Sequence, residues 1–427
     1  MFLKNYMAGA VATALVTASL GASAADWSLG QMARQALATH PEIVGKQYSL
    51  NAAESNVKAA SWQRFPTLAV EGGKANDGNP RFTDVSLTQP IWAGGRITGG
   101  IASAEAQKDA ASASVDEARE DILLRVATAY VEAMRQQARK TIAEKEVEQH
   151  QQLFDMISRR VDAQASARVD RDLAQSRLYQ ADNDLSAAKQ ALATALSQLS
   201  QLVGQRVPAV DDYSINQPMP DSVDTAVDQA TGVSPTLRRY DYQEKAAEAD
   251  ITVKKAAYLP QVSVRFDKFY GQDLITPQNT TRGSRVMLLI QAEPGAGLSA
   301  AAGVGAAVAA KNAAIEARTA ALRDLRLEVS TDWDEYMGAR ERFQSASLST
   351  ASSKAVYESY VRQYTIGKKS WLDVMNTVRE ASQSEMTTAD AKAQMTAAAL
   401  RLEVRTGDTQ FLDEASNVPS AQNYSTP

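Results

Sequence analysis

Apolar residues recur with helical spacing through most of the chain, and two shorter stretches alternate instead. In the first half, Ile122, Val126, Tyr130 and Met134 stand four residues apart, as along one face of a helix. The pattern predicts a single helix over 97–163, which would be roughly 100 Å long at about 1.5 Å per residue. A compact domain cannot hold such a helix, so it must run through water and pack sideways on other helices.

Two stretches, 67–91 and 261–292, show the alternation that is typical of half-buried strands. In the second stretch, Val264 and Phe266 flank the charged Arg265. Each stretch predicts a β-hairpin with one apolar and one polar face. The strands are about ten residues long, which is the length of a strand that crosses a membrane.

The chain also contains an internal duplication. Pro41 and Pro66 recur as Pro235 and Pro260, at a constant offset of 194 residues. A later set recurs at a constant offset of 203 residues: Val126, Thr128, Glu132, Met134, Arg159, Asp170 and Gly204 match Val329, Thr331, Glu335, Met337, Arg362, Asp373 and Gly407. Repetition at this period indicates one structural unit used twice. We therefore expect a first repeat (25–204), a linker (205–233), a second repeat (234–407) and a C-terminal tail (408–427).

Each repeat is expected to hold a helix, a hairpin, a very long helix and a return helix. The second repeat would place its long helix at 300–364 and its return helix at 370–405. In the first repeat, the opening helix 28–63 and the return helix 168–203 together match the long helix in length. These two helices could therefore lie end to end alongside it.

The number of strands points to an oligomer. One chain supplies four strands of membrane length, whereas a membrane barrel needs about eight or more. An open sheet edge is not tolerated in lipid. Three copies would supply twelve strands and close the barrel. The sequence thus predicts a mostly α-helical chain with a small β part, assembled as a homotrimer in which a shared twelve-stranded barrel continues into a bundle of long helices.

Residues 1–24 have the pattern of a secretory signal peptide. Lys4 precedes an apolar run, and Ala22-Ser23-Ala24 suits a signal peptidase site. The alternative is a buried N-terminal helix. Beyond this segment, no apolar run approaches the roughly 20 residues of a membrane-spanning helix. An exported chain of this kind is periplasmic, secreted or an outer-membrane β-barrel.

Composition removes several classes of function. The chain has no cysteine, which excludes disulfides, thiolate metal sites and cysteine nucleophiles. Its two histidines, His40 and His150, lie in different segments and are expected at helix surfaces. The formal net charge of -5 argues against nucleic acid as a partner. No metal-ligand spacing, phosphate loop or nucleophile–base pair occurs, so we predict no metal, no cofactor and no catalysis.

Three motifs carry a resemblance to a known family. They are Ala36-Leu37-Ala38-Thr39-His40-Pro41, Gln89-Pro90-Ile91-Trp92-Ala93-Gly94-Gly95, and the stretch from Arg362 to Val374 that includes Tyr364, Gly367 and Trp371. With this organisation, the chain resembles the TolC family of outer-membrane channel proteins. The resemblance implies a trimeric tunnel in the outer membrane of a Gram-negative bacterium, with a large periplasmic helical barrel that closes at its far end. It also implies docking on an inner-membrane ABC or other transporter through a periplasmic adaptor protein.

The resemblance assigns roles to residues at the two far helical turns. Asp170 and Asp373 would face the pore, where six carboxylates from three chains would attract cations and raise some of their own pKa values. Both residues could instead cap helices. Tyr364 and Lys369 match positions that latch neighbouring helices, although an exposed lysine is usually just solvated. Tip and adaptor contacts would fall on Ala163, Gln164, Ala165, Ile366 and Gly367.

The chain departs from the family pattern at two of these positions. The first turn, Ala163-Gln164-Ala165, lacks the usual glycine, and Asn376 replaces the second acid of the pore pair. The missing glycine bears on the tip geometry and the adaptor contacts of the first repeat, and the missing acid should weaken any cation filter. Near the strand ends, an aromatic girdle at the membrane interface is expected from Trp62, Phe65, Trp92, Phe269 and Tyr270.

Two other classes of function compete with a channel. The first is an enzyme, but the sequence shows no arrangement of a nucleophile beside a base. The second is a periplasmic coiled-coil adaptor or scaffold, which would not need two matched hairpins. Within the channel reading, overall resemblance favours type I secretion of a protein, a large adhesin being one candidate. The alternative is the outer-membrane component of a tripartite drug or small-molecule efflux pump. Outer-membrane lipid is the expected surrounding partner.

Overall fold

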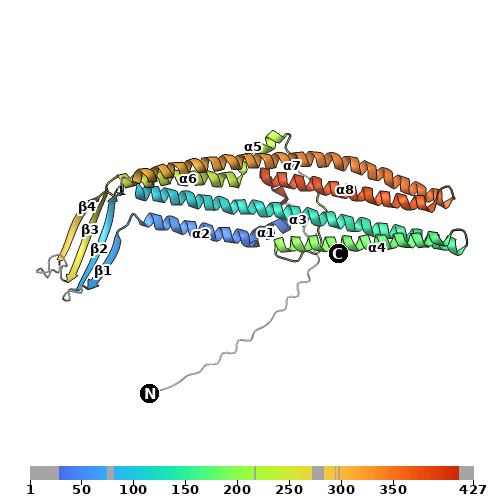
Figure 1. The fold of residues 1–427 in the computed structure, drawn as a ribbon, viewed down its shortest axis with the longest axis horizontal. Coiled ribbons are helices and arrows are strands. Elements are labelled where there is room, and N and C mark those ends of the chain that lie inside the picture. The colour runs from blue at the N-terminus through green and yellow to red at the C-terminus, as the bar shows by residue number, and fades with distance from the viewer. Residues whose placement is uncertain are drawn as a thin grey trace, which may run out of the picture.

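The computed structural model describes residues 28–74, 81–215, 218–271, 283–293, 295–296 and 299–412. The expected signal peptide, 1–24, and the tail from 413 onward lie outside the described residues. The molecule is elongated, with a four-stranded sheet at one end and helices that run from it to the opposite end (Figure 1). Two very long helices set this length, α3 (Arg96–Asp162) and α7 (Ala300–Thr365).

The first repeat opens with two helices, α1 (Leu29–Thr39) and α2 (Pro41–Trp62), where the sequence predicted one helix over 28–63. The break lies at His40, whose ring Nδ1 accepts the backbone N–H of Glu42 at 3.3 Å. Pro41 occupies the first turn of α2, where its missing N–H costs nothing and its ring stops α1 from continuing. His40 is therefore a helix cap.

Two strands, a long helix and a return helix complete this repeat. They are β1 (Thr67–Lys74), β2 (Arg81–Trp92), α3 and α4 (Arg168–Val203). Helix α4 ends at Gly204, whose φ of 77° is matched by the φ of 79° at Gly407, the residue that ends the second repeat's return helix. The two return helices therefore end in the same way, 203 residues apart, as the internal duplication predicts.

The second repeat has the same order. Its elements are α6 (Pro235–Lys255), the short 3₁₀ helix η1 (Ala256–Tyr258), β3 (Gln261–Gly271), β4 (Gly283–Gln291), α7, α8 (Trp371–Thr406) and the 3₁₀ helix η3 (Gln410–Leu412). A further helix, α5 (Val223–Val233), lies inside the segment expected to be a linker. The hydroxyl of Ser234 then caps α6 directly before Pro235, just as the ring of His40 caps α2 directly before Pro41.

The helices pack lengthwise. Helices α2 and α4 lie one after the other along α3, and α6 and α8 lie in the same way along α7 (Figure 1). Buried side chains are densest at mid-length, where α1, α3, α4 and α8 meet; they include Met32, Ile122, Val126, Leu199 and Leu400. Among the described residues, no helix combines the length and the apolar character needed to cross a membrane.

All four strands pair antiparallel in the order β1-β2-β3-β4. Leu68 pairs with Leu87, Leu87 with Phe266, and Phe266 with Val286, so these four side chains form one row across a single face. The mostly α-helical fold with a small four-stranded part and an internal duplication is confirmed.

Candidate functional site

One face of the sheet is apolar and uncovered. Val286, Leu288 and Ile290 on β4 each expose more than 60% of their surface, at 69%, 64% and 68%. Leu68 and Val70 on β1 are similarly open, at 65% and 66%. Soluble proteins rarely leave a contiguous apolar face of this kind bare, so it indicates contact with lipid or with another chain.

The opposite face carries a ladder of ion pairs. Arg265 donates from Nε to Oδ1 of Asp267 at 2.6 Å, and Arg285 donates from Nε to Oδ2 of Asp267 at 2.9 Å. Arg265 also reaches Asp84 on the neighbouring strand at 3.5 Å. Asp267 is only 2% exposed, so its charge depends on these partners. The ladder joins β2, β3 and β4 on the polar face, and the alternation predicted from sequence therefore separates apolar from charged side chains.

Four of the five expected interface aromatics suit that role. Trp62, Phe65 and Trp92 lie where the helices join the sheet and expose 73%, 63% and 46% of their surface. Tyr270, at the other end of β3, pairs with Thr83 on the apolar face and is 45% exposed. Phe269 differs, because the pairing of β3 with β2 places its side chain on the polar face of the sheet.

Phe269 pairs with Asp84 and so shares the face of the ion-pair ladder. Side chains alternate along a strand, and its neighbour Tyr270 already occupies the apolar face. The prediction of a membrane-interface position for Phe269 is therefore corrected: the side chain points to the charged side of the sheet.

The two far helical turns lie together at the end opposite the sheet (Figure 1). In the first turn, Gln164 N–H donates to the Val161 carbonyl at 2.9 Å and Ala165 N–H to the Arg160 carbonyl at 2.8 Å. The second turn repeats both bonds, from Gly367 to Tyr364 at 3.0 Å and from Lys368 to Gln363 at 2.9 Å. The five residues expected to contact an adaptor, namely Ala163, Gln164, Ala165, Ile366 and Gly367, are all exposed.

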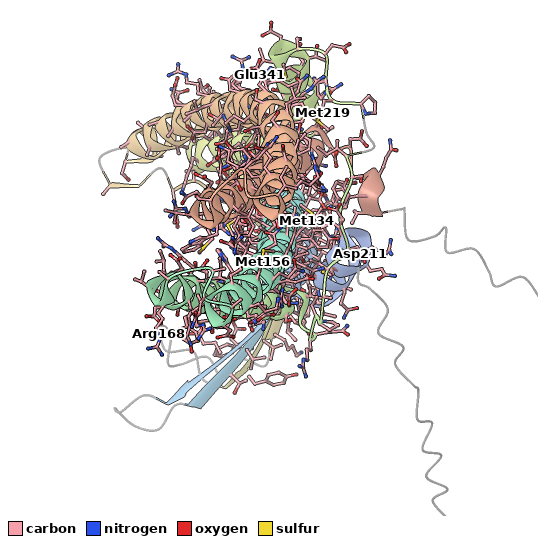
Figure 2. All side chains as sticks on the ribbon, turned by 90° about the vertical axis from the view of Figure 1, so that its right-hand side faces the viewer. Met134, Met156, Arg168, Asp211, Met219 and Glu341 are labelled. Carbon is pink, nitrogen blue, oxygen red and sulfur yellow. The ribbon has the colours of Figure 1, made fainter. Side chains whose placement is uncertain are left out.

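Seen end-on from this tip, α3 with α4 and α7 with α8 form two separate layers (Figure 2). Arg168, which begins α4, lies at the edge of the α3–α4 layer (Figure 2). Each return helix therefore starts at the tip, and its first turn carries one of the two aspartates assigned to the pore.

Both aspartates bond to the backbone at the start of a helix. Asp170 accepts the N–H of Ala167 at 3.2 Å, and Asp373 accepts the N–H of Ser370 at 3.1 Å and its hydroxyl at 2.8 Å. Ser370 in turn accepts the N–H of Asp373 at 3.1 Å, which completes a capping box. The side-chain and backbone hydrogen bonds from Ser370 lower the pKa of Asp373. The capping role expected for Asp373 is thus present within one chain.

The two latch candidates make contacts inside one chain. Tyr364 is 5% exposed and packs among Leu153, Ile157 and Val374, with the Arg160 guanidinium 5.2 Å from its ring centroid. Its buried hydroxyl has no hydrogen-bond partner among the described residues. Lys369 places its ammonium 4.3 Å from the ring centroid of Tyr360. These cation–π contacts tie the end of α3 to α7 and the start of α8 to α7.

His150 is not at a surface, contrary to the sequence expectation. It is 6% exposed on α3, with Nε2 3.8 Å from Glu146. It lines a cavity of about 630 Å³ between α3, α4 and α8. The signal that could have shown this is the heptad spacing, because Ala143 and Ile157, seven residues to either side, are also buried.

Charged contacts between the layers escaped the sequence analysis altogether. Arg139 on α3 binds Asp390 on α8 at 2.9 Å, and Lys145 binds Glu385 at 2.5 Å. Such pairs join residues more than 200 positions apart. They tie the two repeats together along the half of the molecule that leads to the tip.

Comparison with known proteins adds the family. A sequence model described as "Outer membrane efflux protein" matches residues 32–205 and 226–408. The chain is 30% identical over 113 residues to the outer membrane efflux protein BepC of Brucella suis, which covers 24% of this chain and 25% of that protein. It is 25% identical over 236 residues to the nickel-cobalt-cadmium resistance protein NccC of Alcaligenes xylosoxydans, which covers 54% of each.

The chain thus spans a quarter and about half of the length of these two relatives. Among solved structures, it is similar to the outer-membrane channel OprN, with a TM-score of 0.78 and 20% sequence identity over 90% of both chains. At this identity the likeness concerns the fold.

Proposed function

Because this chain belongs to the outer membrane efflux protein family, whose members are outer-membrane channels, we propose that it is the trimeric exit duct of a tripartite exporter. In this proposal three copies share one barrel in the outer membrane, and their long helices form a tunnel through the periplasm. The duct is passive, and the energy for transport comes from an inner-membrane partner.

The observation that carries the proposal is the sheet. Its outer strands, β1 and β4, each pair on one side only within the described chain. One face is apolar and exposed, while the other holds buried, ion-paired charge. In lipid, unpaired strand edges are costly and must be closed by further strands. Twelve strands from three chains would close the barrel with its apolar face toward lipid and its charged face toward a water-filled lumen.

The far tip supports docking on a periplasmic adaptor. Ile366 exposes 66% of its surface at the turn between α7 and α8, beside the exposed Gly367. An exposed apolar side chain on a tight turn is suited to contact with a partner protein. An inner-membrane ABC or other transporter would complete the assembly.

Two cargoes are candidates. Overall resemblance in sequence favours type I secretion of a protein, whereas the names of the relatives, which refer to efflux and metal resistance, favour small solutes. Deletion of the gene separates them. Loss of one large protein from the culture medium supports secretion, and sensitisation to drugs or metal salts with an unchanged set of secreted proteins supports efflux.

The proposed duct is tested first by its assembly and conductance. The purified protein should run as a trimer in detergent and give discrete conductance steps in planar bilayers. A well-folded protein that stays soluble without detergent and never conducts would instead support a periplasmic scaffold.

A further inference from the structure

Five cations gather where the helices join the sheet. The segments 58–66, 93–96, 254–260 and 292–293, which include the adjoining helix ends, lie between the helices and the sheet (Figure 1). They contain a single carboxylate, Glu293, and five basic side chains: Lys58, Arg64, Arg96, Lys254 and Lys255. We refer to these five as the basic collar.

The collar charges are unpaired within the described chain. None of the five side chains takes part in an ion pair or a side-chain hydrogen bond there, and all five are exposed. Some basic residues elsewhere, such as Arg239 and Arg401, have carboxylate partners, and the unpaired ones, such as Lys46, do not lie in a cluster of this kind. Unpaired charge at this density is therefore available for an external anion.

The direction in which these lysines project follows from their spacing. Lys58 stands four residues before Trp62 in α2, and Lys255, the last residue of α6, stands three residues before Tyr258 in the 3₁₀ helix η1. Residues four apart share one face of an α-helix, and residues three apart share one face of a 3₁₀ helix, in each case about one turn from each other. Trp62 and Tyr258 are exposed, at 73% and 43%. In both repeats, then, a lysine lies on the same side as an exposed aromatic and about 6 Å further from the sheet.

Three layers thus follow one another along the outside of the molecule. First comes the apolar face of the sheet, then the aromatic side chains, then the collar. Acyl chains, the membrane interface and the headgroup phosphates follow one another in the same order across one leaflet. Long basic side chains at such a boundary extend their charge toward the headgroups while their methylene stems stay in apolar surroundings.

We propose that the basic collar binds the phosphate groups of anionic phospholipids in the leaflet that faces the periplasm, an inference that rests on the proposed insertion of the sheet into a membrane. The occupant is anionic because five cations against one carboxylate are not balanced by a zwitterionic headgroup. Bound lipid would hold the barrel at a defined depth.

The test uses the full-length trimer in vesicles of phosphatidylcholine alone or mixed with phosphatidylglycerol. Native mass spectrometry then counts the lipids that stay bound. The wild-type protein should retain phosphatidylglycerol in preference to phosphatidylcholine, and added salt should weaken this preference. The triple variant Lys58→Gln, Lys254→Gln, Lys255→Gln should lower the enrichment at least about fivefold, which is the effect of roughly one basic residue near an anionic surface.

A matched control removes the same number of charges elsewhere. Lys46, Lys189 and Lys354 are exposed and have no ion-pair partner in the described chain. Their triple substitution by Gln should leave the enrichment unchanged. No preference in the wild-type protein, or an equal loss in the control, overturns the inference while the channel stands. Failure to insert into either kind of vesicle contradicts the proposed membrane placement itself.

Discussion

Gln164 adopts the left-handed backbone conformation that Gly367 adopts 203 residues later, with φ values of 59° and 76°. Gln164 is the one non-glycine residue with positive φ in the described chain. Both turns need this conformation because it lets two successive N–H groups reach back to the helix that has just ended. The second tip turn thus has glycine at the left-handed position, and the first has a glutamine, whose side chain makes that conformation strained.

This difference predicts that swapping glycine and glutamine has opposite effects on the stability of the two turns. Gln164→Gly should stabilise the first turn by about 1 kcal/mol, since a side chain in this conformation costs about that much. Gly367→Gln should destabilise the second turn by a similar amount. Hydrogen exchange of the turn amides measures both. Gln164→Ala is the control and should change little, because alanine keeps the Cβ; a destabilised Gln164→Gly would contradict the argument.

The pore-facing assignment of the two tip aspartates predicts a change in ion selectivity. In planar bilayers, Asp170→Ala and Asp373→Ala should each reduce the preference for cations, because each removes three carboxylates from the trimer. Asp182→Ala, an exposed aspartate further along α4, serves as the control. Unchanged reversal potentials in the tip variants would reduce both residues to helix caps.

The first turn of α8 should respond to acid. Hydrogen bonds from Ser370 lower the pKa of Asp373 from its ordinary 3.8. A carboxylate whose pKa is lowered by folding adds stability at neutral pH and loses it as the pH falls through the folded-state pKa. The amides of this turn should therefore lose protection below about pH 4, measured as their exchange rate relative to that of an unfolded chain at the same pH. Asp373→Asn should lower this protection already at pH 7 and show little further loss of protection on acidification; a pH response of protection equal to that of the wild-type protein would count against the capping box.

Glu120 should act in the opposite sense. Burial, with Arg405 opposing it and Glu117 and Glu328 adding to it, raises the pKa of this carboxyl to about 7. Between pH 4.5 and about 7 the folded state holds a proton that the unfolded state has released, so Glu120 makes stability fall as the pH rises. Glu120→Gln should thus stabilise the protein at pH 8 by roughly 1–3 kcal/mol and have little effect at pH 4. Thermal unfolding at the two pH values gives the comparison, and equal effects at both would refute the raised pKa.

The ion-pair ladder predicts a cost for the loss of its central carboxylate. Asp267→Ala removes the carboxylate that Arg265 and Arg285 share and leaves Asp84, 3.5 Å from Arg265, as the remaining partner in the ladder, at a cost of roughly 3 kcal/mol. The trimer should then dissociate at lower temperature on a gel. Replacing Asp267 and both arginines together by apolar residues should restore part of the loss; no restoration would mean that the side chain matters for packing rather than for charge.

Most of the fold follows from periodicity. The alternation of apolar and charged residues at Val264, Arg265 and Phe266 predicts which side chains lie on each face of the sheet. The four-residue spacing from Ile122 to Met134 predicts α3. The tip geometry is harder to predict, because a left-handed glutamine has no local signal. The break at His40 also escaped prediction, since alanine-rich segments on both sides of Pro41 read as one continuous helix.

Two errors have a common cause. Phe269 and Tyr270 both read as aromatics near a strand end, and only the strand register separates them. His150 reads as polar, and only its heptad neighbours reveal that it is buried. In each case the prediction followed the type of residue rather than its position in the strand or helix. The ion pairs between α3 and α8 could not be predicted, because they depend on how two repeats with independent helices are placed side by side.

Within the described residues, the sheet is paired on one side only at β1 and at β4, and this bears on how the protein reaches its final state. In the proposed trimer, a lone chain can complete its helices, but the hydrogen bonds at the outer edges of β1 and β4, which have no strand beside them in the described chain, come from other molecules. Folding and assembly would then share their final step, and the stability of the barrel would depend on the concentration of chains in the membrane. Dilution, rather than heat alone, would take such a protein apart.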